Sequence, residues 1–133
     1  MANLVQRVLV RTDLGMPTGL LAAQVAHIHA TPLIQSFKRH YKQALEDIYV
    51  ENVKEWMTTP YLFVHAVPNK EVLDYFITEC SDKQVRHNEW IDTVYVDISP
   101  TQKKVFSDVL IGVSIGPADS DDIKTIVGDL PLL

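Results

Sequence analysis

The residues best suited to chemistry stand in residues 11–29, where a polar turn leads into a helix. This stretch reads R-T-D-L-G-M-P-T-G-L-L-A-A-Q-V-A-H-I-H. Gly15 and Pro17 predict a turn, and Gln24 and His27 then fall in the first turns of the helix that follows. The free N–H groups at a helix start carry positive potential and bind polar groups. The pattern therefore indicates a functional site at this turn.

Three residues of the expected helix share one stripe. Leu20, Gln24 and His27 stand at i, i+4 and i+7, so their side chains lie on one side of the helix. Another side is apolar and is expected to pack on a sheet: Leu21, Ala22, Val25 and Ala26. The helix thus has one side for packing and another for contact with a ligand.

Two other motifs have simpler explanations. Ser114 lies in a G-x-S-x-G motif, which needs a sharp strand-to-helix turn and a histidine later in the chain. Here Ser114 continues an apolar strand and the last histidine is His87, so we interpret the match as accidental. His27 and His29 stand at i and i+2 and do not face each other on a helix. No Cys, Asp or Glu stands near them at ligand spacing, so the sequence predicts neither a metal site nor a cofactor.

A basic run in a second helical pattern offers a further candidate for ligand contact. Lys38, Arg39 and Lys42 could contact phosphate, and the alternative is an ordinary solvated helix face. The whole chain carries 12 Lys+Arg against 17 Asp+Glu, a formal net charge of −5. An acidic chain has no broad attraction for nucleic acid, so any RNA contact must be local.

The elements that position these residues follow the order β-α-β-α-β-β-α. Apolar runs predict strands at Leu4–Arg11, Tyr61–Val67, 93–98 and 108–115. Helical spacing predicts helices at 19–30, 34–48 with further turns at 52–57, 69–79, and one from residue 120 that stops at Gly128 and Pro131. Thr31-Pro32 is expected to end or kink the first helix, since proline cannot donate the hydrogen bond of a continuing turn. Residues 81–91 and 99–107 have the composition of polar, irregular segments.

The connections between the strands indicate a mixed sheet. Helices separate the first three strands, which favours parallel pairing with right-handed crossovers. The third and fourth strands are joined without a helix, which favours an antiparallel pair. We therefore expect one α/β domain over residues 1–133, with a mixed four-stranded sheet and helices on both faces.

Length and composition agree with one ordinary domain. The chain has 133 residues, of which 47% are hydrophobic and 22% are charged. The single cysteine, Cys80, falls among apolar helix positions and is expected to be a buried thiol. No apolar stretch reaches the roughly 20 residues that a membrane span needs, and residues 1–10 do not resemble a signal peptide. The sequence predicts a cytoplasmic protein without a membrane partner.

Several segments resemble the archaeal/eukaryotic-type peptidyl-tRNA hydrolases. That family's pattern is a strand ending R-x-D-L-x-M, followed by G-K-x-A-A-Q-x-x-H, and residues 11–27 are similar to it. Residues 113–118, V-S-I-G-P-A, are similar to the family's G-I-G-P-A segment. Asp97 followed by Thr101-Gln102 resembles its D-x-G-R-T-Q loop, and Trp56 has a counterpart ahead of the second strand. The likeness covers most of the chain.

The resemblance implies a fold, an activity and a set of site residues. The family is an αβα sandwich with a mixed sheet, usually forms a homodimer, and cleaves the ester between peptide and tRNA without a metal. tRNA is therefore the implied partner. The implied catalytic residues are His27, Asp97 and Thr101, and the implied substrate contacts are Gln24, Arg11 and Asp13, with Lys38, Arg39 and Lys42 as candidates for added phosphate contacts.

The chain departs from the family's pattern at positions that bear on activity. Leu20 stands where the motif has lysine, the residue suited to hold phosphate or stabilise developing negative charge. Ser99 and Pro100 stand where the loop has glycine and arginine. Losing one preorganised donor typically lowers a rate by about 10²–10³. A leucine supplies no such donor.

Two hypotheses follow from these departures. In the first, the protein hydrolyses peptidyl-tRNA or a smaller ester, with Asp97 positioning water, possible help from His27, and Thr101 supporting the oxyanion. In the second, it is a catalytically inactive relative that acts as a binding or regulatory module. The retained motif residues favour hydrolysis, whereas Leu20, Pro100 and the acidic charge favour the binding module.

Overall fold

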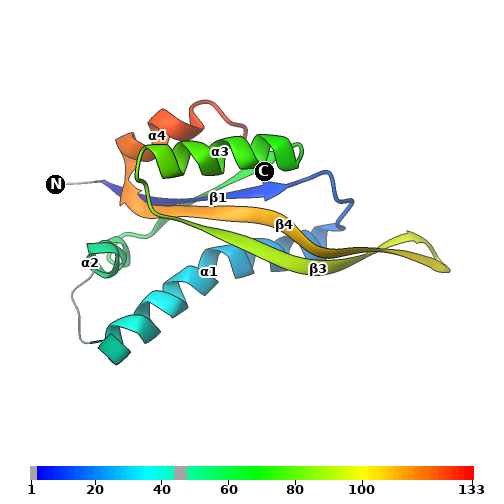
Figure 1. The fold of residues 1–133 in the computed structure, drawn as a ribbon, viewed down its shortest axis with the longest axis horizontal. Helices are drawn as coiled ribbons and strands as arrows, with labels where there is room; N and C mark the ends of the chain where they lie inside the picture. The colour runs from blue at the N-terminus through cyan, green and yellow to red at the C-terminus, as the bar shows by residue number, and fades with distance from the viewer. Residues whose placement is uncertain (1–2, 44–47) are drawn as a thin grey trace.

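In the part of the chain that the structure describes, a mixed sheet with strand order β2-β1-β4-β3 lies between two layers of helices (Figure 1). The structure is a computed structural model, and it describes the backbone of residues 3–43 and 48–133 and the side chains of residues 3–36 and 50–133. The elements are β1 (Leu4–Arg11), α1 (Thr18–Gln43), α2 (Ile48–Trp56), β2 (Tyr61–Val67), α3 (Lys70–Asp82), β3 (His87–Ser99), β4 (Gln102–Asp119) and α4 (Ser120–Val127). This architecture confirms the predicted α/β fold with a mixed four-stranded sheet, counted over those residues.

Two strand pairings, β1 with β2 and β3 with β4, match those expected from the connections, whereas within the described residues β3 pairs with neither β1 nor β2. β1 pairs in parallel with β2, and it pairs antiparallel with β4 on its other side. β3 and β4 form an antiparallel pair. The helices α3 and α4 cover one face of the sheet and α1 and α2 the other (Figure 1). The two central strands, β1 and β4, are therefore covered on both faces, which explains their continuous apolar runs.

The first helix does not end at Thr31-Pro32, which was one of the two outcomes predicted there, the other being a kink. α1 continues through Pro32 to Gln43. Pro32 is buried, so its packing offsets the one helical hydrogen bond that proline removes. The expected boundary was wrong because tertiary contact outweighed a local preference.

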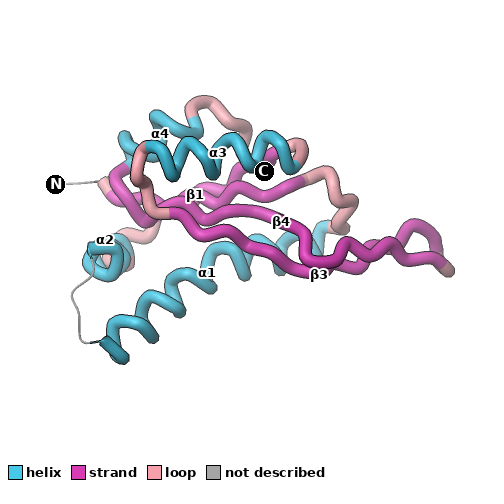
Figure 2. The backbone as a smooth tube through the Cα atoms, viewed as in Figure 1, coloured by secondary structure: helices cyan, strands magenta, loops and turns pink. Residues whose placement is uncertain are grey.

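The segments predicted to be irregular contain a long hairpin instead. β3 begins at His87 and reaches Ser99, and β4 resumes at Gln102 after a two-residue turn. The hairpin extends past the helices on both faces (Figure 2). Its outer part therefore meets solvent on both sides, and Tyr95 and Ile98 are 61% and 64% exposed. Residues 93–98 of this outer part are predicted as a strand, whereas residues 87–92 of β3 and 102–107 of β4 are the parts of the hairpin that the sequence prediction missed.

β4 also continues past the point where it was predicted to stop. Gly116-Pro117 was expected to end the strand, yet β4 runs on to Asp119. Its pairing with β1 shifts register between Val5 and Arg7, so the strand absorbs the proline at an irregularity.

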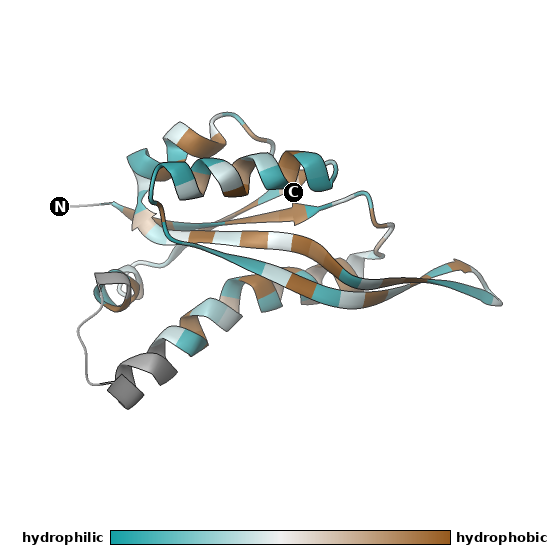
Figure 3. Ribbon diagram, viewed as in Figure 1, coloured by the Kyte–Doolittle hydropathy of each residue, from teal (hydrophilic) through white to brown (hydrophobic). Residues whose placement is uncertain are grey.

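Two apolar clusters fill the space between the sheet and its helices. The first lies under α3 and α4: Val5, Leu9, Val67, Leu73, Phe76, Cys80, Leu110, Val113, Ile115, Ile123, Ile126 and Val127. The second lies under α1: Val8, Val10, Leu14, Ile28, Val94 and Ile111. Figure 3 shows hydrophobic residues along β1 and β4, which supply both clusters. Burial raises the pKa of the Cys80 thiol to about 11, and the predicted buried thiol is confirmed.

A buried polar network joins α1 to the sheet. Gln6 Nε2 donates to Ser114 Oγ at 3.0 Å and to the carbonyl oxygen of His29 at 3.1 Å. His29 Nδ1 donates to Gln6 Oε1 at 2.6 Å, and burial lowers the pKa of His29. Ser114 is fully buried within β4. It is therefore a structural hydroxyl, in agreement with the interpretation of its motif as accidental.

Gly112 lets α1 approach the sheet closely. A Cβ atom at this position would lie 2.4 Å from the carbonyl oxygen of Leu9 and 2.6 Å from Ile28 Cδ1. The first contact is with backbone of the neighbouring strand, so it cannot be relieved by a side-chain rotation.

We predict that Gly112→Ala destabilises the protein by about 2 kcal/mol, the usual range for overpacking. Gly19→Ala is the matched control, because a Cβ there meets nothing within 4 Å and alanine favours a helix. The measurement is denaturant unfolding followed by circular dichroism. Equal stability of the two variants would contradict the close approach at Gly112.

Candidate functional site

The amide of Gln24 joins α1 to two residues of β3. Gln24 is buried, and its Nε2 donates to Asp92 Oδ2 at 3.1 Å. Its Oε1 accepts a hydrogen bond from Trp90 Nε1 at 2.7 Å. Trp90 and Asp92 stand two residues apart on a strand, so both side chains can point to the α1 face. The three side chains form a compact polar group, called here the Gln24 triad.

His27 lies beside the Gln24 triad. Its ring stacks on Trp90 with 5.2 Å between ring centroids and 16° between the ring planes. It stands three residues after Gln24 on α1, on the same side of the helix, and its side chain is exposed. The exposed imidazole thus contacts the indole of Trp90, and the half-buried carboxylate of Asp92 is linked to the same indole through Gln24.

An irregularity in the hairpin fixes the direction of Asp92. The β3–β4 register shifts between Asp92 and Val94. Asp108 on the opposite strand adopts a left-handed φ of 49°, and its N–H donates to Thr93 Oγ1 at 3.1 Å. The N–H of Thr93 donates to Asp92 Oδ1 at 2.8 Å. Bulges of this kind redirect side chains near functional sites, and here one carboxylate oxygen is held by β3 and the other by α1.

Asp97 and Thr101 lie farther along the hairpin. Both are exposed, and Asp97 stands opposite Lys103 in the β3–β4 register. The N–H of Thr101 donates to Ser99 Oγ at 3.4 Å in the turn. No hydrogen bond joins either residue to Gln24 or His27 among the described side chains. Their catalytic role stays a prediction.

Arg11 and Asp13 form a closed brace at the turn. Arg11 Nε and Nη2 donate to the two carboxylate oxygens of Asp13 at 3.0 and 2.8 Å, and Nη1 donates to the carbonyl oxygen of Leu110 at 3.0 Å. The hydrogen bond with Asp13 raises the pKa of Arg11, and the Arg11 guanidinium lowers the pKa of Asp13. The geometry directs both groups at the protein itself, and their predicted substrate contact stays a prediction.

Leu20 packs where the motif residue would be charged. It is half-buried and rests against the apolar cluster under α1. It stands one helical turn before Gln24, on the same stripe of α1. This position therefore contributes apolar packing beside the Gln24 triad.

The basic residues of the second helical pattern cannot be placed. Lys38, Arg39 and Lys42 belong to α1, but their side chains lie outside the part of the chain that the structure describes. Their contact with phosphate stays a prediction.

Sequence reasoning missed two residues of the site, Trp90 and Asp92. Residues 81–91 were taken as irregular, so neither residue had an element to orient it. The signal that could have found them is the spacing in N-E-W-I-D-T-V-Y-V, where Trp90, Asp92 and Val94 alternate with other residues. An indole N–H and a carboxylate two residues apart on one strand face would have been a candidate pair.

The described residues also bear on metals and membranes. Over that part of the chain, no group of three or more His, Cys, Asp or Glu side chains is arranged to hold a metal ion. None of the helices within the same residues is long and apolar enough to cross a membrane.

Comparison with known protein families identifies a match for this chain. The family model described as Peptidyl-tRNA hydrolase PTH2 matches residues 4–133, nearly the whole chain. No curated protein matches the chain significantly. The family match confirms the resemblance that was predicted from residues 11–27 and the segments near the C-terminus.

We predict that Asp13→Asn destabilises the protein in a pH-dependent way. Because folding lowers the pKa of Asp13, its ionised form stabilises the fold above the unfolded-chain value of about 3.9, and this contribution is lost as the pH falls through the lower folded value. The difference in free energy of unfolding between the natural protein and the variant should be largest near neutral pH and shrink below about pH 4. Urea unfolding at several pH values measures it. A difference that is constant with pH would contradict the ionic nature of the brace.

Proposed function

We propose that this chain, which belongs to the peptidyl-tRNA hydrolase PTH2 family, hydrolyses the ester between a peptide and tRNA at the Gln24 triad. The observation that carries the proposal is the hydrogen bond between Gln24 Nε2 and Asp92 Oδ2. It holds a carboxylate on the α1 face beside an exposed histidine. A positioned carboxylate and an imidazole are the groups that ester hydrolysis with water requires.

Asp92 acts as the general base in this proposal. Each of its oxygens accepts one hydrogen bond from the protein, at 2.8 Å from Thr93 N and 3.1 Å from Gln24 Nε2, so further lone pairs remain for water. Water gives a proton to Asp92 while its oxygen bonds to the ester carbonyl carbon. The bond between that carbon and the ribose oxygen then breaks, and His27 donates a proton to the leaving oxygen. Proton exchange with solvent returns both groups to their starting states.

Gln24 is a positioning residue in this scheme. Its oxygen and one N–H of its amide are engaged by β3, and Nε2 carries a second N–H that neither bond uses. Its contribution is to fix the carboxylate of Asp92 and the indole of Trp90 relative to α1. Fixing reacting groups in this way supplies part of the rate of many enzymes.

Leu20 sets an upper limit on the rate. A half-buried leucine supplies no donor to the oxyanion or to a phosphate, and loss of one such donor costs about 10²–10³ in rate. We therefore expect slow hydrolysis.

A second function, binding without catalysis, has specific support. The amide of Gln24 already forms hydrogen bonds to Asp92 and Trp90, and Leu20 extends the apolar packing beside it. These are the features of a stable recognition surface as much as of a catalyst. Release of the acyl group, measured directly, separates the two functions.

We predict that Asp92→Asn lowers the release of N-acetylaminoacyl groups from tRNA by about 100-fold or more, because the variant cannot accept the proton of water. Asp97→Asn on the same strand is the comparison, because Asp97 is the base that the family resemblance implies. Asp82→Asn at the end of α3, outside the site, is the matched control and should keep the natural rate. Loss of activity in Asp97→Asn alone would assign the base to the outer hairpin. If the natural protein releases no acyl group at any concentration, hydrolysis is contradicted and binding without catalysis is the remaining function.

We predict that Leu20→Lys raises the rate of the same reaction by about tenfold or more, since it restores a cation one turn before Gln24. The substitution should also cost about 1 kcal/mol of folding stability, because it removes apolar packing. Leu20→Gln, which changes polarity without adding a charge, is the control. An equal rate in the two variants would show that charge at this position does not aid the reaction.

A further inference from the structure

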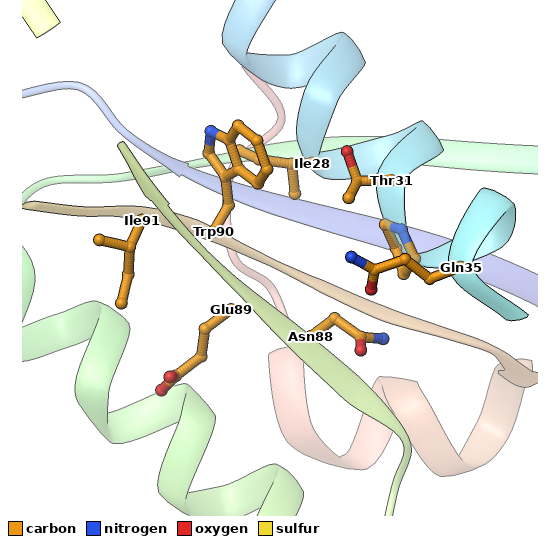
Figure 4. A pocket seen from close by; sticks show the side chains of 8 residues that line it. Ile28, Thr31, Gln35, Asn88, Glu89, Trp90 and Ile91 are labelled. Atoms are coloured by element: carbon orange, nitrogen blue, oxygen red, sulfur yellow. The ribbon is translucent and has the colours of Figure 1, made fainter. Parts of the chain in front are cut away.

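A groove lies between α1 and β3 and adjoins the Gln24 triad at Trp90. Its volume is about 300 Å³. One wall is a single stripe of α1 at i, i+3, i+4 and i+7, and the other is a run of consecutive β3 residues. The lining residues are Ile28, Thr31, Pro32 and Gln35 from α1, and Asn88, Glu89, Trp90 and Ile91 from β3 (Figure 4).

The groove follows the edge of β3. Successive side chains of a strand point to opposite faces, so residues 88–91 can all line one groove only if it runs along the strand's edge. Figure 4 shows Glu89 and Ile91 on one side of this strand and Trp90 on the other. β3 is the last strand of the sheet and pairs only with β4 in the described part of the chain. Backbone N–H and C=O groups on its outer side are therefore available to another strand.

The groove carries unused capacity for neutral hydrogen bonds. Asn88 Nδ2 is buried and has no hydrogen-bond partner among the described residues, and Gln35 points toward the same space (Figure 4). Thr31 adds a hydroxyl group. Pro32 has no N–H, so the carbonyl of Ile28 lacks its usual helical donor. A buried amide without a partner is costly, and a ligand that satisfies it gains that free energy.

The charge of the described lining residues does not favour a phosphate as the occupant of the groove. None of its described lining residues is Lys or Arg, and its one charged group is Glu89. Asp92 follows directly on β3. A nucleic acid backbone needs cations at its contacts, whereas an extended peptide needs backbone hydrogen bonds and neutral side chains.

We propose that this groove binds the peptide part of the substrate as an added strand along residues 88–91 of β3. The inference rests on the proposed function, which places the ester at the Gln24 triad. The residue esterified to tRNA then lies nearest Asp92, and the preceding residues extend toward Asn88. The peptide therefore runs parallel to β3, and the four-residue edge, roughly 13 Å long, accommodates three to four residues.

The arrangement assigns separate tasks to the two walls. The β3 edge pairs with the peptide backbone and is indifferent to sequence, and Asn88 donates to a peptide carbonyl. Ile28, Pro32 and Trp90 offer apolar contact to alternate side chains. A hydrolase acting on many different peptides requires this combination.

The first experiment compares substrates of different peptide length. The kcat/KM for N-acetyltripeptidyl-tRNA should exceed that for N-acetylaminoacyl-tRNA by about tenfold, because the longer substrate has the lower KM. Asn88→Ala should abolish this advantage and leave the kcat/KM for the shorter substrate unchanged. Asn52→Ala on α2, outside the groove, is the matched control and should keep the advantage. Equal kcat/KM for the two substrates with the natural protein would overturn the proposal.

The second experiment does not depend on catalysis. The probes are N-acetyltripeptide amide, the same peptide with its central nitrogen methylated, and the trinucleotide CCA, each titrated while the amide resonances of Asn88 and Gln35 are followed by NMR. Binding of the first peptide at those residues, with loss on methylation, supports the groove even if no ester is cleaved, so failure of the proposed function is recognised separately. Binding of CCA there, binding of the methylated peptide equally well, or no peptide binding would each overturn the proposal.

Discussion

The contact between α1 and β3 depends on a single buried amide. Gln24 cannot leave its donor or acceptor unpaired in a dry interface without a cost of about 1–3 kcal/mol. Its two bonds, to Trp90 and Asp92, satisfy both ends and so determine how the helix sits against the last strand. The groove beside Trp90 and the orientation of the carboxylate both follow from this one requirement.

Much of the fold follows from sequence pattern because its central strands are covered on both faces. The apolar runs of β1 and of residues 108–115 in β4, and the capped start of α3 at Asn69, agree with local signals. Residues 87–92 of β3 and 102–107 of β4 did not agree, since polar and apolar residues are mixed there and none of them is fully buried. The helix end predicted at Pro32 was wrong for another reason. Pro32 is buried, and its packing offsets the helical hydrogen bond that proline removes.

The site was predictable in part, and the reason is spatial. The spacing of Gln24 and His27 places both side chains on one side of a helix, so the sequence alone predicts that they lie together. Asp92 reaches Gln24 across 68 positions of sequence, through a strand whose start was not recognised. The sequence places Arg11 at the end of β1, beside the turn, but only the structure shows that its guanidinium donates to Asp13 and to the carbonyl oxygen of Leu110.

The hairpin behaves mechanically as a cantilever, a beam held at one end and free at the other. The fixed end of the hairpin, its root, is where α1 contacts β3 through Gln24 and Asp92. Asp92 lies there, next to the bulge in which the N–H of Asp108 donates to Thr93 Oγ1. Thermal deflection of such a beam is least at the root and grows toward the tip. A carboxylate at the root therefore keeps its distance from α1 better than one at the turn near Pro100 would.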